Sequence, residues 1–273
     1  MTSELVRDLT VRGHHVATSV RTSVRPGDGR PLLLCNGIGA NLGLLQPLVD
    51  ALDPAIPVVR FDVPGVGASP TPGLPYRFAT LAALVGDLLD QLDVDEVDVL
   101  GISWGGGLAQ QFALQNPRRC KRLVLVSTGT GFLMVPGRPR VLAKMITPRR
   151  YREPEYAASI AGELYGGRMR DQPGLAAPLL DGNEPLGSRR GYFLQLAAGI
   201  GWTSLPFLPL LRQPTLLLAG DDDPIIPLVN AQLMRRLLPH ATLHVFHDGH
   251  LGLLTGAREL APVIGEFLRG SDG

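Results

Sequence analysis

Short apolar runs alternate with amphipathic stretches along most of the chain. Six runs of strand length lie at 31–35, 58–63, 95–101, 122–126, 214–219 and 242–246, and two further β-rich segments at 15–20 and 22–25 precede them. Helical spacing appears at 81–92, 104–116, 228–238 and 252–269, with Pro117 ending the second helix. This alternation predicts an α/β fold with a mostly parallel central sheet covered by helices on both faces.

The regular alternation stops between 129 and 204, where Gly, Pro and Arg are frequent among short helical pieces. A chain of 273 residues lies near the upper size of one domain. We therefore expect a core of residues 1–128 and 205–273 with a mainly helical lid inserted at 129–204.

Composition excludes some classes of partner. Apolar residues make up 45% and charged residues 19% of the chain, and the formal net charge is +1. With so small a net charge, the protein has no strong electrostatic field that would attract nucleic acid or an anionic membrane. The lid segment carries ten Lys or Arg against six Asp or Glu, whereas the rest carries 16 against 19. Its net charge of +4 could face an acidic surface or product, although a solvated face is the simpler interpretation.

The cysteines and the N-terminal residues indicate a reducing compartment. Cys35 and Cys120 are too few for a disulfide framework and form no metal-ligand cluster. The N-terminal residues lack the apolar core of a signal peptide, and no apolar stretch approaches the roughly 20 residues that span a bilayer. We expect a cytoplasmic protein with neither a transmembrane segment nor a metal.

Gly101-Ile102-Ser103-Trp104-Gly105 lies between an apolar run and a helix. This is the context of a nucleophile elbow, in which small residues allow a sharp turn that projects the serine hydroxyl. A bare match would often be a structural glycine turn, but the strand and the helix on either side favour a nucleophile at Ser103.

A serine nucleophile needs a base, and His250 is the candidate among six histidines. It follows the last predicted strand, where this fold places its catalytic histidine. His247 lies closer to that strand and is interpreted as structural. An acid must then orient the imidazole, and it should come between serine and histidine in the chain. Asp221, Asp222 and Asp223 all follow the run at 214–219.

Asp223 is our choice of acid because the following Pro-Ile-Ile-Pro matches the pattern that places the acid in related hydrolases; Asp222 is the second choice. The aspartate triplet could also bind a hard cation, but no surrounding oxygen ligands support such a site. Backbone N–H groups of Trp104 and Ile38 are the expected oxyanion donors. Asn36, Phe132, Met134 and Trp202 are candidate substrate-pocket residues, with ordinary lid packing as the alternative.

With these residues placed, the sequence resembles the intracellular poly(3-hydroxyalkanoate) depolymerases that act on medium-chain-length polyesters. The likeness covers nearly the whole chain and is carried by the segments 34–41, 61–67, 103–106, 109–112, 199–204 and 220–224. It implies a serine esterase associated with storage granules, without a cofactor, whose triad matches Ser103, Asp223 and His250. Asn36, where many hydrolases have histidine, agrees with the depolymerase pattern.

Other functions share these residues. A small-molecule carboxylesterase, a lactonase or a carbon–carbon-bond hydrolase can use the same triad. A proline iminopeptidase also has Ser-Trp-Gly, but its lid should offer carboxylates to the substrate ammonium. A receptor that keeps the fold and turns over negligibly is a further alternative. Dehalogenase and epoxide hydrolase chemistry would need an aspartate in place of Ser103.

Overall fold

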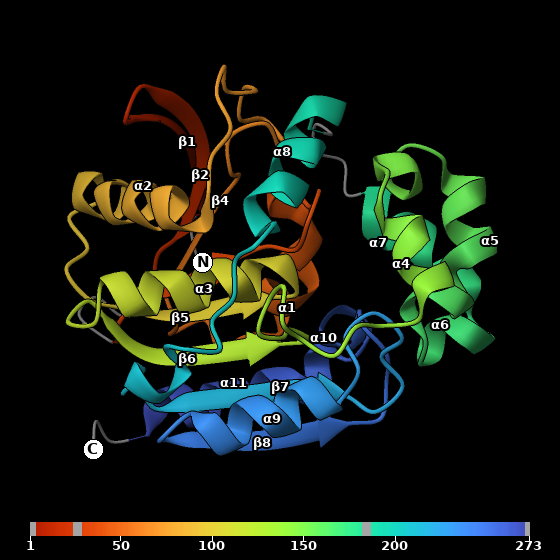
Figure 1. The fold of residues 1–273 in the computed structure, drawn as a ribbon. Helices are drawn as coiled ribbons and strands as arrows, with labels where there is room; N and C mark the ends of the chain where they lie inside the picture. Colours follow the sequence, from red (N-terminus) through yellow and green to blue (C-terminus); the bar gives the residue numbers. More distant parts are fainter. Residues whose placement is uncertain (1–3, 24–28, 182–186, 271–273) are drawn as a thin grey trace.

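A computed structural model of the chain describes residues 4–23, 29–181 and 187–270. Its described strands form one eight-stranded sheet in the order β1-β2-β4-β3-β5-β6-β7-β8 (Figure 1). The strands are β1 (Glu4–Val11), β2 (His14–Arg21), β3 (Leu32–Cys35), β4 (Val58–Phe61), β5 (Val97–Ile102), β6 (Cys120–Val126), β7 (Thr215–Gly220) and β8 (Ala241–Phe246). Only the β1–β2 and β2–β4 pairs of these described strands are antiparallel.

Helices cover both faces of this sheet, as the alternating pattern predicts. One face packs against α2 (Phe78–Gln91), α3 (Trp104–Gln115) and α9 (Val229–Leu237). The other packs against α1 (Gln46–Ala51), α10 (Gly252–Thr255) and α11 (Ala257–Arg269). In β3, Leu33 and Cys35 join the first core while Leu32 and Leu34 join the second. Both faces of the central strands are therefore apolar, which is why these strands appear as continuous apolar runs.

The sequence prediction failed at the first edge of the sheet. Of the segment expected at 22–25, Thr22 and Ser23 are not in a strand, and 24–25 lie outside the described residues. The first strand is instead β1, which forms a hairpin with β2 through Arg12 and Gly13, both with positive φ. Most β1 side chains are exposed. An edge strand with polar residues on an open face gives no apolar run to recognise.

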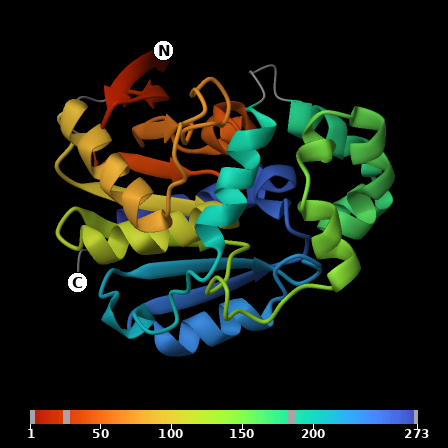
Figure 2. The same ribbon diagram turned by 45° about the horizontal axis from the view of Figure 1, so that its top comes forward.

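The segment between β6 and β7 contains the remaining helices: α4 (Pro139–Met145), η2 (Pro148–Tyr151), α5 (Pro154–Tyr165), α6 (Arg168–Asp171), η3 (Pro173–Leu175), α7 (Ala176–Asp181) and α8 (Arg189–Gly199). Short 3-10 turns also occur at η1 (Leu42–Leu45) and η4 (Leu208–Leu210). Prolines open α4, η2 and α5, where their missing N–H and fixed φ fit the first turn. Helices α4 to α7 lie beyond the carboxyl ends of the strands, and α8 returns towards α3 (Figures 1 and 2).

Both cysteines are free and buried in the core. Cys35 ends β3 and Cys120 begins β6. Burial raises the pKa of the Cys35 thiol to about 12 and also raises that of Cys120, because a thiolate is poorly solvated in an apolar interior. Both side chains therefore behave as small apolar groups at neutral pH.

Among the described residues, no helix combines the length and the hydropathy that crossing a bilayer requires. Nor do any three His, Cys, Asp or Glu side chains within the described ranges gather as metal ligands would.

Candidate active site

Ser103 occupies a strained turn between β5 and α3. Its backbone has φ 54° and ψ −120°, in a region that residues other than glycine rarely adopt. Close packing enforces the turn: a Cβ at Gly105 would overlap the carbonyl oxygens of Cys35 and Asn36. The Ser103 carbonyl is held by the Thr128 hydroxyl, which donates to it at 2.7 Å. The sequence pattern at 101–105 therefore corresponds to a sharp strand-to-helix turn that carries the serine at its apex.

His250 lies within hydrogen-bond distance of both Ser103 and Asp223. Its Nε2 is 2.9 Å from Ser103 Oγ, and its Nδ1 is 2.8 Å from Asp223 Oδ2. The side chains of His250 and Asp223 are almost fully buried, at 4% and 1% exposure. The second carboxylate oxygen, Asp223 Oδ1, accepts the N–H groups of Ile225 and Ile226, each at 2.9 Å. Hydrogen bonds at both oxygens fix this carboxylate facing the imidazole.

The neighbouring aspartates bind other partners. Asp222 forms a bidentate ion pair with Arg170 at 2.6 and 2.9 Å and accepts the Gly167 N–H at 2.7 Å. The hydrogen bond from Arg170 holds the pKa of Asp222 below its usual range. Asp221 pairs with the exposed His247. Of the three carboxylates, the structure brings only Asp223 to His250.

The segment between β6 and β7 also contacts the loop that carries His250. The backbone N–H of His250 donates to the carbonyl of Tyr165, at the end of α5, at 2.7 Å. Asp248 accepts the N–H of Arg168 at 2.9 Å and the hydroxyl of Thr255 at 2.6 Å. The turn between α5 and α6 is thus bonded to the loops of both His250 and Asp222.

The loop after β3 lies beside the serine. A Cβ built at Gly37 would stand 3.8 Å from Ser103 Cβ. Asn36 does not project into the cavity: its amide donates to the Asn41 carbonyl and its oxygen accepts the Gly37 N–H at 3.2 Å. Asn36 therefore shapes the loop, while Ile38 and Trp104 occupy backbone positions soon after β3 and β5.

A cavity of about 190 Å³ opens onto Ser103. Its other lining side chains are mostly apolar and include Phe78, Trp104, Thr128, Met134, Trp202 and Ile226. Two of the predicted pocket residues, Met134 and Trp202, are among them. The other two, Asn36 and Phe132, do not line the cavity, and Phe132 is 68% exposed on the surface. Phe78 and Trp202 meet edge to face with ring centroids 4.7 Å apart, so part of the wall is aromatic.

Comparison with known proteins identifies the family. The sequence profile of the α/β hydrolase fold matches residues 30–257. A poly(3-hydroxyalkanoate) depolymerase from Ectopseudomonas oleovorans is 53% identical over 253 residues, covering 92% of this chain and 89% of that protein. The chain belongs to that family of α/β hydrolases.

More distant relatives of this hydrolase show the range of the fold. A 3-oxoadipate enol-lactonase from Acinetobacter baylyi is 28% identical, and the aligned region covers 82% of this chain and 83% of the lactonase. Among solved structures, an enol-lactonase from Burkholderia xenovorans superposes with a TM-score of 0.82 at 22% identity, covering 97% of this chain and all of that one. At 22% identity, the likeness to the Burkholderia structure supports the fold alone.

Sequence reasoning missed the contacts that a buried residue of the hydrolase, Gln195, and a partly buried one, Tyr151, make with the site. Gln195 in α8 accepts the Gly39 N–H at 2.7 Å, and its backbone carbonyl accepts the Trp104 indole N–H at 2.8 Å. Tyr151 donates to the Ile38 carbonyl at 2.8 Å. Gln195 and Tyr151 both come from the segment between β6 and β7, where no periodic pattern marks an inward-facing position. The sequence therefore held no signal for these contacts.

Proposed function

We propose that this hydrolase cleaves ester bonds of poly(3-hydroxyalkanoate), with medium-chain-length polyester as the substrate, through an acyl-enzyme on Ser103. The observation that carries the proposal is the continuous hydrogen-bonded chain from Asp223 through His250 to Ser103, at the mouth of an apolar cavity. The 53% identity to the depolymerase supports the choice of substrate.

The chemistry follows from the positions of these three side chains. Ser103 Oγ attacks the ester carbonyl carbon while its proton passes to His250 Nε2. The carbonyl oxygen gains the displaced electron pair, and the backbone N–H groups of Ile38 and Trp104 stabilise it. The leaving hydroxyl end then takes the proton from His250. A water molecule then attacks the acyl-enzyme in the same way, with His250 taking its proton, and releases the acid and free Ser103. Asp223 holds the imidazole orientation and stabilises its charged form. Every proton in this scheme is carried by a side chain of the triad, so the proposal needs no cofactor.

We also propose that residues 129–204 form a lid over this site. Helices α4 to α7 of this segment stand beyond the carboxyl ends of the strands (Figure 2). The cavity at Ser103 lies between Met134 and Trp202 of the lid and Phe78 and Trp104 of the core.

Four apolar side chains of the lid are 45–68% exposed and directly neighbour, in sequence, residues that line this cavity: Phe132, Leu133, Val135 and Ile200, together called the apolar patch. The Phe132 N–H donates to the Trp202 carbonyl at 2.7 Å, which keeps these two parts of the lid together. An insoluble polyester cannot diffuse into a cavity, so the enzyme must bind its surface. We propose that the apolar patch rests on the polymer granule, in the cytoplasm, and that one chain reaches Ser103 between Met134 and Trp202.

The deciding experiment is clearing of a stabilised medium-chain polyhydroxyalkanoate latex by the purified protein. Ser103→Ala serves as the matched inactive variant, and nitrophenyl esters of graded length serve as soluble substrates. Clearing by the wild type but not by Ser103→Ala supports the assignment of depolymerase activity. Hydrolysis of soluble esters without clearing would reassign the protein as a small-molecule esterase or lactonase. Ligand binding that survives Ser103→Ala, with negligible turnover, would favour a receptor.

A further inference from the structure

Arg150 is a buried cation beside the site, with no carboxylate partner in the part of the chain that the structure describes. It lies in η2 and is 2% exposed. Across the described ranges, no carboxylate forms a salt bridge with it, and its Nε lacks a hydrogen-bond partner. Its other nitrogens donate to Tyr192 Oη at 2.8 Å and to the carbonyls of Thr147 and Ile38 at 3.3 and 3.4 Å. Burying a cation with only neutral partners carries a desolvation cost that these hydrogen bonds offset in part.

Two aromatic rings contact Arg150 and stabilise the cation without cancelling its charge. Its guanidinium carbon stands 4.5 Å from the ring centroid of Tyr151 and 5.4 Å from that of Tyr192. Burial raises the pKa of Tyr192 and of Tyr165 above the ordinary phenol value, because the charged form is poorly solvated there. Both phenols are therefore neutral at physiological pH. Within the described residues, Arg150 is thus stabilised by neutral oxygen acceptors and aromatic rings and not by an anion, and its positive charge lies next to the Ile38 carbonyl.

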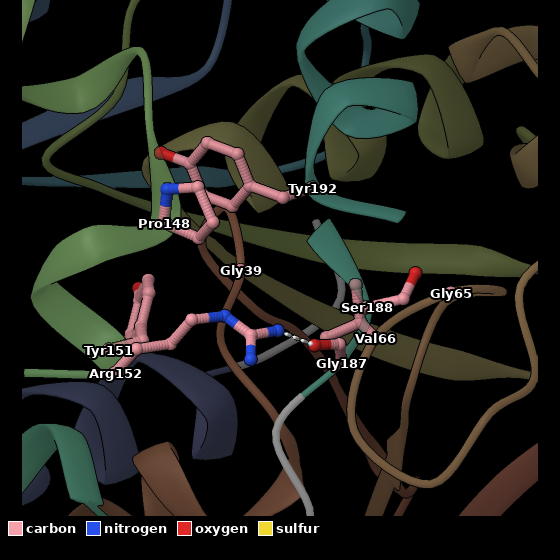
Figure 3. A pocket seen from close by; sticks show the side chains of 9 residues that line it. All are labelled: Gly39, Gly65, Val66, Pro148, Tyr151, Arg152, Gly187, Ser188 and Tyr192. Atoms are coloured by element: carbon pink, nitrogen blue, oxygen red, sulfur yellow. Dashed lines mark hydrogen bonds between the residues drawn. The ribbon is translucent and has the colours of Figure 1, made fainter. Parts of the chain in front are cut away.

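The peptide group between Ile38 and Gly39 is held at both of its polar atoms by lid side chains. The Ile38 carbonyl accepts the Tyr151 hydroxyl at 2.8 Å as well as Arg150, and the Gly39 N–H donates to Gln195 Oε1 at 2.7 Å. A Cβ at Gly39 would lie 2.7 Å from the Tyr151 ring and 2.8 Å from the Tyr192 ring. Figure 3 shows Gly39 with these two tyrosines among the residues around one small pocket. Hydrogen bonds and close packing thus both restrain this peptide.

We infer that Arg150, Tyr151 and Gln195 are positioning residues for the oxyanion loop. By fixing the 38–39 peptide they keep the preceding N–H, that of Ile38, directed towards the ester oxygen bound at Ser103. The charge of Arg150 adds positive potential where that oxygen gains its electron pair. Preorganised donors and charges of this kind act mainly on the transition state. The inference rests on the proposed function, because it concerns the oxyanion of that reaction.

The test compares Tyr151→Phe, Arg150→Met and Arg150→Lys with the wild type on nitrophenyl butyrate. Removing an oxyanion donor outright lowers kcat by about 100- to 1,000-fold; these substitutions leave the donor in place, so we expect a smaller loss of about tenfold in kcat with KM nearly unchanged. Arg150→Lys should recover part of the loss because it keeps the charge. In Tyr151→Phe, which changes no charge at neutral pH, the pH at half-maximal rate should not move.

Two inhibitors separate positioning from general damage. An alkylboronic acid forms a tetrahedral, negatively charged adduct with Ser103 Oγ, whereas the matching alkyl amide binds only as a ground-state analogue. Affinity for the boronic acid should fall with kcat while affinity for the amide holds. Arg149→Met and Tyr156→Phe are controls in the same lid segment, because Arg149 pairs with the exposed Glu153 and its guanidinium lies over the Tyr156 ring instead of at the oxyanion loop.

Equal loss of both affinities, or unchanged kcat in Tyr151→Phe and Arg150→Met, would overturn the inference. Should Arg150→Met fail to fold by circular dichroism, Tyr151→Phe still decides, because it removes one hydroxyl only. A wild-type protein inert toward every ester would instead defeat the proposed function, which is a separate outcome.

Discussion

At the scale of single residues, the adjacent carboxylates Asp222 and Asp223 differ sharply in surroundings. Asp223 is buried against His250, whereas the Asp222 side chain is 44% exposed and pairs with Arg170. The Asp-x-x-x-Pro pattern favoured Asp223 but left the choice open. Sequence could not decide between them, because the choice depends on where the α5–α6 turn, which is distant in sequence, places Arg170 and the Gly167 N–H.

Substituting the two aspartates in turn should separate their roles. Asp223→Asn should lower kcat on a soluble ester by several orders of magnitude, because an amide stabilises the wrong imidazole tautomer and no longer balances its charge. Asp222→Asn is its matched control, with the same chemical change one residue away, and should keep kcat within about threefold. Steady-state kinetics measures both. A larger loss in Asp222→Asn would reverse the assignment.

Asp222 should instead contribute to stability in a pH-dependent way. Its pKa lies below the ordinary value of 3.8 because of the Arg170 hydrogen bond. The unfolded chain therefore binds this proton more readily than the folded chain, and the contribution is present above about pH 4 and is lost as pH falls further. Because the pair is exposed, the effect is at most about 1 kcal/mol.

The measurement is Tm against pH for wild type and Asp222→Asn. The wild type should be slightly more stable at neutral pH, and the difference should vanish on the acidic side. A constant difference across the whole range would mean that the carboxylate charge makes no contribution.

At the scale of elements, apolar runs identify the central strands and the helices that follow them. Both faces of β3, β5, β6 and β7 are covered, so their composition alone predicts them. The same reasoning misses β1, whose side chains are mostly exposed, and treats α10 and α11 as one helix although Gly256 separates them. It also misses the hydrogen bonds of Tyr151 and Gln195 with the loop after β3, because the bonded partners lie in segments distant in sequence.

The junction of β5, α3 and the loop after β3 should be intolerant of added volume. Gly105→Ala would improve helix propensity slightly, but its Cβ would overlap the Cys35 and Asn36 carbonyl oxygens, which are backbone atoms and cannot rotate away. We expect a loss of about 1–3 kcal/mol in the free energy of unfolding.

Chemical denaturation of Gly105→Ala and of Gly73→Ala checks this expectation. Gly73 is the control because a Cβ added there would meet nothing within 4 Å and its φ is not in the left-handed region. Gly73→Ala should change stability by less than about 0.5 kcal/mol. Equal effects of the two substitutions would show that the close approach of the Cys35 and Asn36 carbonyl oxygens does not restrict position 105 to glycine.

At the scale of the whole molecule, the proposed division into core and lid makes soluble-ester turnover and polymer turnover separable. The apolar patch lies on the lid surface, and three of its residues, Phe132, Leu133 and Ile200, are more than half exposed without lining the cavity. Changes there should affect contact with a polymer surface and leave the chemistry of small esters as it is.

Phe132→Ser combined with Ile200→Ser should slow latex clearing at least severalfold while nitrophenyl butyrate kinetics stay unchanged. The matched control is Leu210→Ser, a similarly exposed leucine in η4. Leu210 lines a separate cavity with Cys120 and Pro214, near the amino ends of β6 and β7 and away from Ser103. If both activities fall in parallel, or if Leu210→Ser slows clearing as much, the patch is not the polymer-binding surface.

The two buried thiols make transient opening of the folded protein measurable. Alkylating reagents react with thiolates, and both Cys35 and Cys120 are inaccessible and held as thiols in the folded protein. Labelling must therefore wait for a fluctuation that exposes the end of β3 at Cys35 or the start of β6 at Cys120. When the protein recloses faster than the reagent reacts, the modification rate reports the population of opened molecules without any engineered probe. Ligands that stabilise the native state should slow the modification in proportion to their occupancy.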